Sequence, residues 1–289
     1  MTVTLRPVSA VSFHDLTAAY NAAYSDYIIP IYATTSSITR LRDHVAVDFE
    51  ASQVAVVGNR IVGFGFLGVR GQRGWISSIA VLPDYRRQGI GRIIMDGLTR
   101  TARGRGLTRL QLEVGAHNTP ALALYDQLGY QRQGELLTVG LDERPDFAET
   151  GPVHTSYADR VLSTYERTHP IMPPWQREKA SLLAVAWDRV AWYVGADVSA
   201  YIIGYTWDGV ISFDDVGFQP GEEAAFRALL AGLFDLYPEI ICRMSSINAA
   251  EPAWAIMAEA GFEVVMTEYQ MTFALDQSVP RSPTSAAGS

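Results

Sequence analysis

The chain has 289 residues, about twice the size of a typical domain, and 48% of them are hydrophobic, so two packed domains are expected. The net charge of -8 argues against a nucleic-acid-binding protein, because such proteins carry a basic surface. The single cysteine, Cys242, excludes an internal disulfide and a multi-thiolate metal site, and we expect it to be a buried small side chain.

Other patterns exclude further classes of protein. No run of about 18 uncharged apolar residues occurs, and residues 1–7 lack the apolar core of a signal peptide, so we expect a cytoplasmic protein without a membrane partner. The five histidines show no helical i, i+4 pairing, and no metal site is indicated. Residues 1–145 hold fifteen basic and twelve acidic side chains, whereas residues 146–289 hold eight and nineteen. An acidic second half would attract a cationic substrate, although a solvated acidic surface is the more common explanation.

The first part of the chain alternates between helical and strand patterns. Residues 3–8 alternate as a strand, and residues 13–27 and 38–49 have the spacing of helices. Residues 53–57 and 61–69 are predicted strands, joined by a hairpin turn at Gly58-Asn59-Arg60. A further strand follows at 75–81, then a helix, a strand at 110–114, a helix, and a last strand at 136–141. The order is β-α-α-β-β-β-α-β-α-β.

A basic, glycine-bearing turn joins the strand at 75–81 to the next helix. The turn contains Arg86, Arg87, Gly89, Gly91 and Arg92, and an apolar stripe at every fourth residue begins directly after it. A helix N-terminus offers unpaired N–H groups and the positive end of the helix dipole, and glycine lets a phosphate approach them. The turn therefore resembles an anion-binding loop. A solvated helix start is the alternative for glycines and arginines in this position.

Other nucleotide-binding motifs fit this turn poorly. A dinucleotide fingerprint requires a third glycine where Ile94 stands, and a Walker loop requires Gly-Lys-Ser/Thr, which is absent. A second pattern lies downstream, where Asn118, Ala121, Tyr125 and Gly129-Tyr130 follow the strand at 110–114. There Thr119 is a predicted cap, Pro120 enters the helix at its first position, and Gly129 ends it.

The ordered pair Arg-x-x-Gly-x-Gly and Asn-x-x-Ala-x-x-x-Tyr, over residues 74–130, resembles the two signatures of the GNAT superfamily of N-acyltransferases. The resemblance implies an α/β (α+β mixed sheet) fold, with acetyl-CoA (coenzyme A) bound where the fourth and fifth strands diverge. It implies backbone contacts from Ile79 and Val81 to the pantetheine arm. It also implies that the loop holds the pyrophosphate and that Asn118 contacts the arm or a strand end. The loop residues are Arg86, Arg87, Gln88, Gly89, Gly91 and Arg92.

The catalytic residues are inferred from the same resemblance. Tyr125 matches the tyrosine that protonates the leaving thiolate, although it also lies on an apolar helix stripe and would suit a core position. Glu113 is our candidate base. Side chains alternate between the two faces of a strand, so Glu113 lies on the face opposite Leu110, Leu112 and Val114. A structural salt bridge is the alternative for Glu113, and His117 is the second candidate base. Trp75 stands where some relatives carry a catalytic glutamate.

The acceptor is expected to be a primary amine, of a small molecule or of a peptide N-terminus. Contacts to it are expected near the first two helices, where a carboxylate lies among phenols that suit an amine or, alternatively, a core. We name Tyr24, Asp26 and Tyr27 as substrate-binding residues; Tyr20 and Tyr32 lie in the same cluster.

The second half repeats parts of the first. Residues 209–216 parallel 74–81, and Asn248 through Phe262 parallel Asn118 through Tyr130, which indicates an internal duplication. The copy lacks the anion-binding loop, because Glu222 and Glu223 occupy its place. We therefore predict an acetyl-CoA-binding domain at 1–145, a linker at 146–156, a degenerate copy at 157–276 and a disordered tail at 277–289. The tryptophans of the copy are expected to be mostly core: Trp175, Trp187, Trp192, Trp207 and Trp254.

Two functions follow from these patterns. The first is a tandem GNAT N-acetyltransferase that transfers acetyl directly between its two bound substrates. The second is an acyl-CoA-binding or scaffold protein that has lost catalysis. The retained Tyr125 and the intact Arg86-x-x-Gly89-x-Gly91 favour the first. The protein is expected to be a monomer or a homodimer, since the copy would either replace a partner subunit or form an interface.

Overall fold

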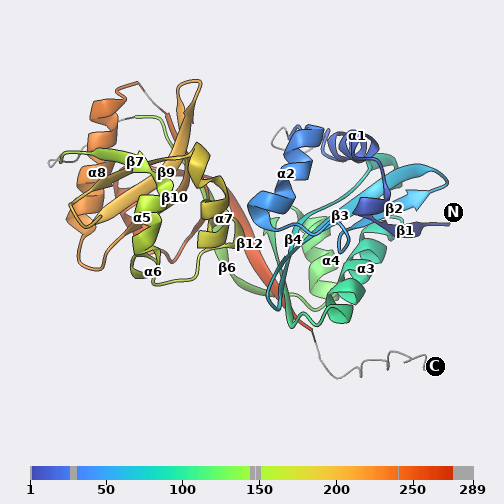
Figure 1. Cartoon of the computed structure of the whole chain (residues 1–289). Coiled ribbons are helices and arrows are strands. Elements are labelled where there is room, and N and C mark those ends of the chain that lie inside the picture. Colours follow the sequence, from blue (N-terminus) through green and yellow to red (C-terminus); the bar gives the residue numbers. More distant parts are fainter. Residues whose placement is uncertain (1, 27–30, 144–146, 148–150, 240, 276–289) are drawn as a thin grey trace, which may run out of the picture.

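The computed structural model describes residues 2–26, 31–143, 147, 151–239 and 241–275. Its strands form one mixed sheet of 12 strands that runs through two lobes, with helices on both faces (Figure 1). The tail predicted at 277–289 and parts of the predicted linker lie outside the described residues.

The N-terminal half has the predicted order of elements. They are β1 (Thr4–Pro7), α1 (Phe13–Ala23), α2 (Thr35–Val45), β2 (Gln53–Val57), β3 (Arg60–Arg70), β4 (Arg73–Val81), α3 (Ile90–Gly104), β5 (Arg109–Gly115), α4 (Thr119–Gln127) and β6 (Gln131–Leu141). The hairpin at Gly58-Asn59 is confirmed, with Gly58 at a φ of 59°. Asn118 rather than Thr119 caps α4, since its Oδ1 accepts a hydrogen bond from the Ala121 N–H at 3.3 Å.

The C-terminal half repeats this plan with shorter helices at its start. Its elements are β7 (His154–Tyr157), α5 (Ala158–Val161), α6 (Tyr165–Thr168), α7 (Lys179–Val185), β8 (Val190–Val194), β9 (Ala200–Trp207), β10 (Val210–Phe218), α8 (Glu223–Leu236), β11 (Ile241–Asn248), α9 (Pro252–Glu259) and β12 (Glu263–Ala274). β7 begins inside the segment predicted as linker. The parallel pair β10–β11 corresponds to β4–β5, so the fold consists of two copies of one plan in tandem.

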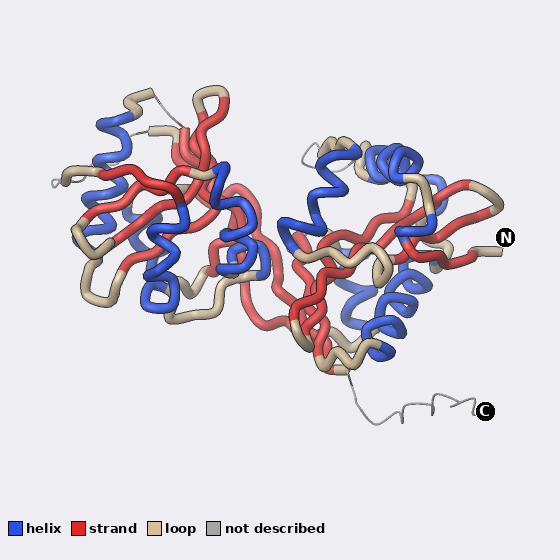
Figure 2. The backbone as a smooth tube through the Cα atoms, in the orientation of Figure 1, coloured by secondary structure: helices blue, strands red, loops and turns tan. Residues whose placement is uncertain are grey.

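The two halves exchange their last strands. The sheet order is β1-β2-β3-β4-β5-β12-β6-β11-β10-β9-β8-β7. β12 of the C-terminal half therefore pairs with β5, and β6 of the N-terminal half pairs with β11. β6 and β12 also pair with each other and cross between the lobes (Figure 2). The sheet of each half is thus completed by a strand of the other.

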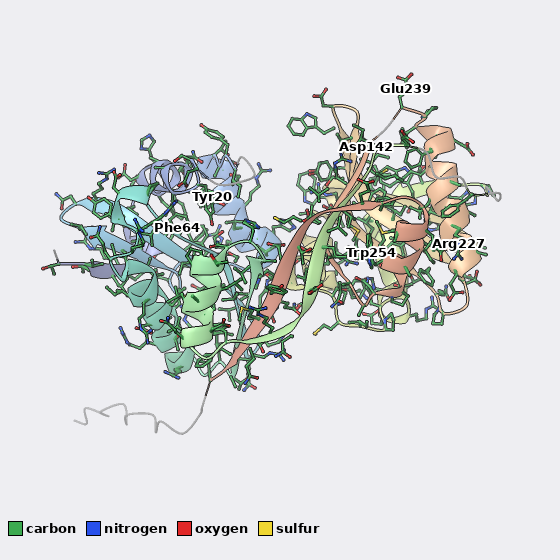
Figure 3. All side chains as sticks on the ribbon, turned by 180° about the vertical axis from the view of Figure 1, so that it is seen from behind. Tyr20, Phe64, Asp142, Arg227, Glu239 and Trp254 are labelled. Carbon is green, nitrogen blue, oxygen red and sulfur yellow. The ribbon has the colours of Figure 1, made fainter. Side chains whose placement is uncertain are left out.

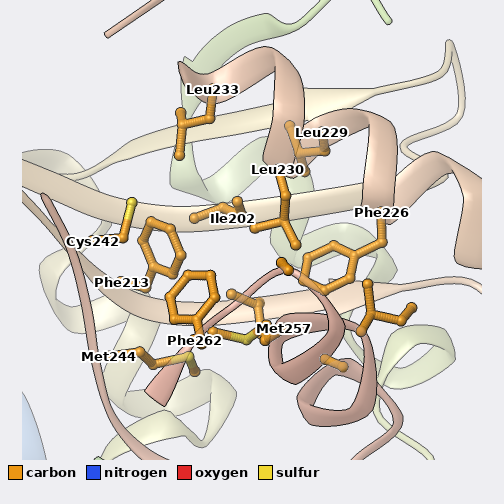
Figure 4. Close-up of a cluster of buried hydrophobic side chains, with 14 of the residues drawn as sticks. Ile202, Phe213, Phe226, Leu229, Leu230, Leu233, Cys242, Met244, Met257 and Phe262 are labelled. Atoms are coloured by element: carbon orange, nitrogen blue, oxygen red, sulfur yellow. The ribbon is translucent and has the colours of Figure 1, made fainter. Parts of the chain in front are cut away.

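Each half has its own core. Helix α3 packs so closely against β3 that a Cβ on Gly65 would lie 2.7 Å from the side chain of Ile94. The core of the C-terminal half includes Phe226 of α8, Phe213 of β10 and Cys242 of β11 (Figure 4). Cys242 is buried as predicted, and burial raises the pKa of its thiol to about 12. Packing of α3 on β3 fixes the helix start at the end of β4, where the site described next is found.

A one-turn segment of the C-terminal half enters the core of the N-terminal half. Trp175 is fully buried, stacks on Trp75 at a ring distance of 5.8 Å, and donates from Nε1 to the Val45 carbonyl at 2.8 Å. Arg70 and Arg73 flank its ring and both form ion pairs with Glu178.

Not all the tryptophans of the C-terminal half are core residues. Trp175 and Trp192 are buried and the partly buried Trp254 packs against the core, in line with the expectation that these tryptophans are mostly core, whereas Trp187 and Trp207 are 76% and 77% exposed. Trp187 follows the short helix α7, and Trp207 ends β9 at the hairpin before β10, where a side chain extends beyond the layers of the sheet and its helices.

Candidate active site

A cleft opens where β4 and β5 separate. The two strands pair in parallel only as far as Ile76 and Leu112. Beyond this point β4 continues to Val81, and in the described part of the chain it pairs there only with β3. The cleft has a volume of about 1120 Å³, and Ile79, Ala80 and Val81 line it together with residues of α1, α3 and α4. The separation leaves one backbone edge of β4 facing the cleft, where an extended ligand can pair with it.

The first turn of α3 borders the same cleft. Gly89 precedes the helix at a φ of 77°, a left-handed conformation that glycine adopts without strain. A Cβ on Gly91 would lie 3.4 Å from Leu124 of α4, so the helix start and α4 are closely apposed. The first N–H groups of the helix have no intrahelical acceptors, and together with the helix dipole they favour an anion here.

Two arginines of the loop are available to such an anion. Arg87 and Arg92 line the cleft, their side chains are exposed, and neither forms an ion pair with a described residue. Arg87 has a φ of 57°, which is uncommon for a residue with a side chain. Gln88 is not among the lining residues, because its Nε2 donates back to the Asp84 carbonyl at 3.1 Å.

The side chains of Arg86 and Asp26 pair with each other rather than extending into open space. The guanidinium of Arg86 donates two hydrogen bonds to the Asp26 carboxylate, at 2.6 and 2.8 Å. It also donates to the carbonyls of Ala23 and Val81, at 2.9 and 3.1 Å. The bonds to Arg86 lower the pKa of Asp26. This arginine therefore ties the end of α1 to the end of β4, and both residues line the cleft as parts of its wall.

Helix α4 brings Tyr125 to the cleft. Tyr125 lines it and is otherwise buried, at 4% exposure, with its ring 5.8 Å from that of Tyr130. Asn118, which caps the helix, and His117 line the same cleft, and His117 is exposed. The predicted pyrophosphate loop, Tyr125 and the open edge of β4 are thus brought to one cavity.

Glu113 lies on β5, one residue beyond the last pairing with β4. It faces away from Leu110, Leu112 and Val114, which belong to the core under α3 and α4. Its Oε2 accepts a hydrogen bond from Trp75 Nε1, whereas Oε1 is buried and has no described donor in hydrogen-bonding geometry. Burial raises the pKa of Glu113 to about 8; nearby Glu268 adds to this rise, whereas hydrogen bonding from the side chains of Trp75 and Gln270 opposes it. Glu113 is not among the residues that line the cleft.

The residues predicted near the acceptor differ in whether they line the cleft. Tyr24 lines the cleft, and its ring contacts Tyr20 at 4.8 Å. Tyr20 is mainly a core residue, stacked on Phe64 at 5.2 Å beneath α1 (Figure 3), and Tyr32 is 82% exposed. Tyr27 lies outside the described residues.

Known proteins resemble this chain in sequence and in fold. A model of the acetyltransferase (GNAT) family matches residues 14–130. The chain is 30% identical over 126 residues to the [ribosomal protein bS18]-alanine N-acetyltransferase of Escherichia coli K12, covering 44% of this chain and 81% of that protein. The chain is a member of the GNAT acetyltransferase family.

Two solved structures share the fold of this acetyltransferase over both halves. One is a tandem GNAT protein from the clavulanic acid biosynthesis pathway, with a TM-score of 0.70, 17% identity, and coverage of 96% of this chain and 100% of that chain. The other is a GCN5-related N-acetyltransferase from Sphaerobacter thermophilus, with a TM-score of 0.67, 16% identity, and coverage of 94% and 96%. At these identities they support the tandem fold alone.

The equivalent strand separation in the C-terminal half of the acetyltransferase is filled by Arg177. β10 and β11 pair only as far as Phe213 and Met244. Beyond this point the guanidinium of Arg177, 1% exposed, donates to Asp215 of β10 at 2.8 Å and to Glu251 at 2.7 Å.

The helix that follows β10 also lacks an anion-binding start. Glu222 occupies the N-cap position of α8, without a capping hydrogen bond from its side chain, and Glu223 is the first residue of the helix, so two carboxylates stand where the N-terminal half has its basic loop.

The described residues of the acetyltransferase contain neither a helix that is long and apolar enough to cross a membrane nor a group of three metal-binding side chains.

Proposed function

We propose that the N-terminal half transfers an acetyl group from acetyl-CoA to a primary amine, of a small molecule or of a peptide N-terminus, while both substrates are bound. The observation that carries this proposal is the single cleft lined by the open edge of β4, the first turn of α3 and Tyr125. The Escherichia coli relative is named for acetylating an alanine of a ribosomal protein, which supports a peptide amine as one class of acceptor.

The residues of the cleft fit acetyl-CoA. The backbone of Ile79 and Val81 would pair with its pantetheine arm. The first N–H groups of α3, from Gly91 onward, would hold its pyrophosphate together with Arg87 and Arg92. Gly89 leaves the approach open, since no atom lies within 4 Å of where its Cβ would be. Gln88 would take part through its backbone and Asn118 through its side chain, while Arg86 supports the loop through Asp26.

The chemistry requires that the acceptor nitrogen lose two protons and that the leaving sulfur gain one. Acetyl-CoA supplies the acetyl group as a thioester. Glu113 would accept the proton that the ammonium of the acceptor must lose before its nitrogen forms the new N–C bond, directly or through water. Tyr125 would donate its hydroxyl proton to the sulfur as the C–S bond breaks, and the second proton that the acceptor nitrogen loses as the amide forms would return to the Tyr125 oxygen, directly or through water. A carboxyl with a pKa of about 8 suits a base that works near neutral pH.

Steady-state turnover of acetyl-CoA with a panel of amines and short peptides tests this function. Tyr125→Phe should lower kcat by about 100-fold or more, because the general acid is lost. Tyr130→Phe is the matched control, since the Tyr130 hydroxyl is buried without a hydrogen-bond partner among the described residues. Binding of acetyl-CoA without turnover anywhere in the panel would instead support the acyl-CoA-binding scaffold.

A second variant tests the cofactor site itself. Gly89→Glu should abolish acetyl-CoA binding in a calorimetric titration, because it places a carboxylate at the predicted pyrophosphate position. Gly71→Glu is the control, since Gly71 also has a positive φ, 56°, and open space around its Cβ position, but lies in the hairpin between β3 and β4. Equal affinity of both variants and the wild type would remove the cofactor assignment.

A further inference from the structure

The strand exchange places residues of the C-terminal half beside Glu113. In the β12–β5 pairing, Gln270 lies directly opposite Glu113, and Glu268 lies opposite Gly115. Paired residues share a face of the sheet and successive residues alternate between faces. Glu113, Gln270 and Glu268 therefore project from the same face, while Leu112, Val114 and Met271 of the same two strands belong to the core under α3 and α4.

The two glutamates of this face carry no compensating charge from the described protein. Among the residues that the structure describes, neither Glu113 nor Glu268 forms an ion pair with an arginine, lysine or histidine. Both side chains are partly enclosed, and burial raises the pKa of each. A partly buried carboxyl group without a cation either keeps its proton, as the raised pKa indicates, or ionises when another group supplies a positive charge.

An unused acceptor atom marks where that cation would bind. Glu113 Oε1 is buried and accepts no hydrogen bond of regular geometry in the described chain, while Oε2 is held by Trp75; the Gln270 amide opposite it on β12 is a neighbouring donor that helps to lower the pKa of Glu113. Buried polar atoms in folded proteins nearly always have a partner, so an orphaned carboxylate oxygen indicates a missing donor. Glu113 also directly follows the last residue of β5 that pairs with β4, the point in the sheet beyond which the cleft opens, although neither Glu113 nor Glu268 is among the residues that line it.

We propose that Glu268, from the C-terminal half, forms with Glu113 a binding subsite for the protonated amine of the acceptor. The C-terminal half thereby completes the acceptor site of the N-terminal half. This inference rests on the proposed function and adds a specificity-determining residue to it. An ammonium group has three N–H donors and one positive charge, which matches two carboxylates without a counter-ion.

Kinetics of the full-length protein with the panel of amines and free-N-terminal peptides test this inference. Glu268→Gln should raise KM for the amine about 10-fold or more, with KM for acetyl-CoA unchanged, because a charge-assisted hydrogen bond to the ammonium is lost. Glu268→Asp should recover part of that affinity. Glu263→Gln, an exposed position on the same strand, is the matched control. A structural role alone would alter folding or both KM values together.

Two results would overturn the subsite. The first is a Glu268→Gln variant with unchanged KM for every amine in the panel. The second concerns the case in which the wild type binds acetyl-CoA but acetylates no amine, which means that the proposed function has failed. Calorimetric titration with the same amines, and with an N-acetylated peptide as the uncharged control, then decides separately. Amine binding that Glu268→Gln weakens supports the subsite, and no amine binding, or binding that this variant leaves unchanged, rejects it.

Discussion

At the scale of single residues, the molecule depends most on a carboxyl group that is held in an unfavourable place. Glu113 is enclosed between β4 and β12, accepts one hydrogen bond from Trp75, and faces Glu268 instead of a basic residue. Such an arrangement costs stability when the group is charged. Strained groups of this kind concentrate at functional sites, where the cost is offset by the rest of the fold.

The pH dependence of stability should reveal this cost. Because the pKa of Glu113 is raised from 4.5 to about 8, the folded protein keeps a proton that the unfolded chain has lost between these values. The free energy of unfolding should therefore fall as pH rises from about 4.5 to about 8, by on the order of 3 kcal/mol from this group. Glu113→Gln, which can still accept from Trp75, should remove this part of the decline.

Urea unfolding of both proteins at pH 5, 6.5 and 8.5 measures the difference. The variant should gain on the wild type as pH rises, and Glu263→Gln, exposed on β12, should retain the wild-type profile. A constant difference between wild type and Glu113→Gln across this range would show that Glu113 ionises as an ordinary carboxyl group.

Single residues were predicted well where local pattern decides their place. The parity of β5 placed Glu113 on the face opposite Leu112, and the positive φ of Gly89 matches its expected role at the start of α3. The partners of these residues were not predictable. Arg86 and Asp26 are 60 positions apart in the chain, and no local pattern indicates that they form a bidentate pair. The same holds for the Trp75 donor to Glu113.

At the scale of elements, helix existence was predicted and helix limits were not. The expected helix at 38–49 is α2 at Thr35–Val45. It begins earlier because Thr34 and Ser37 form a capping box outside the apolar periodicity, and it ends earlier because Ala46 adopts a left-handed conformation, with a φ of 58°. The expected helix at 13–27 ends at Ala23, beyond which Arg86 binds the Ala23 carbonyl.

The short segment that carries Trp175 joins the two halves, and its removal should be costly. Trp175→Ala should lower the free energy of unfolding by about 3–5 kcal/mol, because it empties a fully buried site between Trp75 and the guanidinium groups of Arg70 and Arg73. Trp187→Ala, which removes a 76% exposed indole, should cost no more than about 0.5 kcal/mol. Denaturant unfolding followed by circular dichroism compares the two, and equal effects would contradict the role of Trp175.

At the scale of the whole molecule, the duplication was predicted but the strand exchange was not. β6 has the same alternating pattern whether it pairs with β5 of its own half or with β11 of the other. The choice depends on long-range pairing, which no local pattern reports. The same limit hid the contribution of Glu268, since only the exchange brings β12 next to β5.

The exchange should make the two halves unfold as one unit. Phe226→Ala, in the core of the C-terminal half, should lower the melting temperature of the whole protein by about 5–10 °C, including the N-terminal half. Arg227→Ala, the neighbouring surface residue paired with Glu259, should change it little. Calorimetry should show one transition for each protein, and a separate N-terminal transition that Phe226→Ala leaves unmoved would contradict this coupling.

The position of β12 also fixes when the protein can first work. The ribosome makes β5, at residues 109–115, long before β12, at residues 263–274, although the two strands are neighbours in the sheet. A nascent chain that has emerged through β6 therefore holds the entire basic loop and Tyr125, yet lacks the strand that borders Glu113. We therefore expect acetyl transfer to begin only after β12 has been synthesised, and a message cut short before β12 to yield an inactive protein.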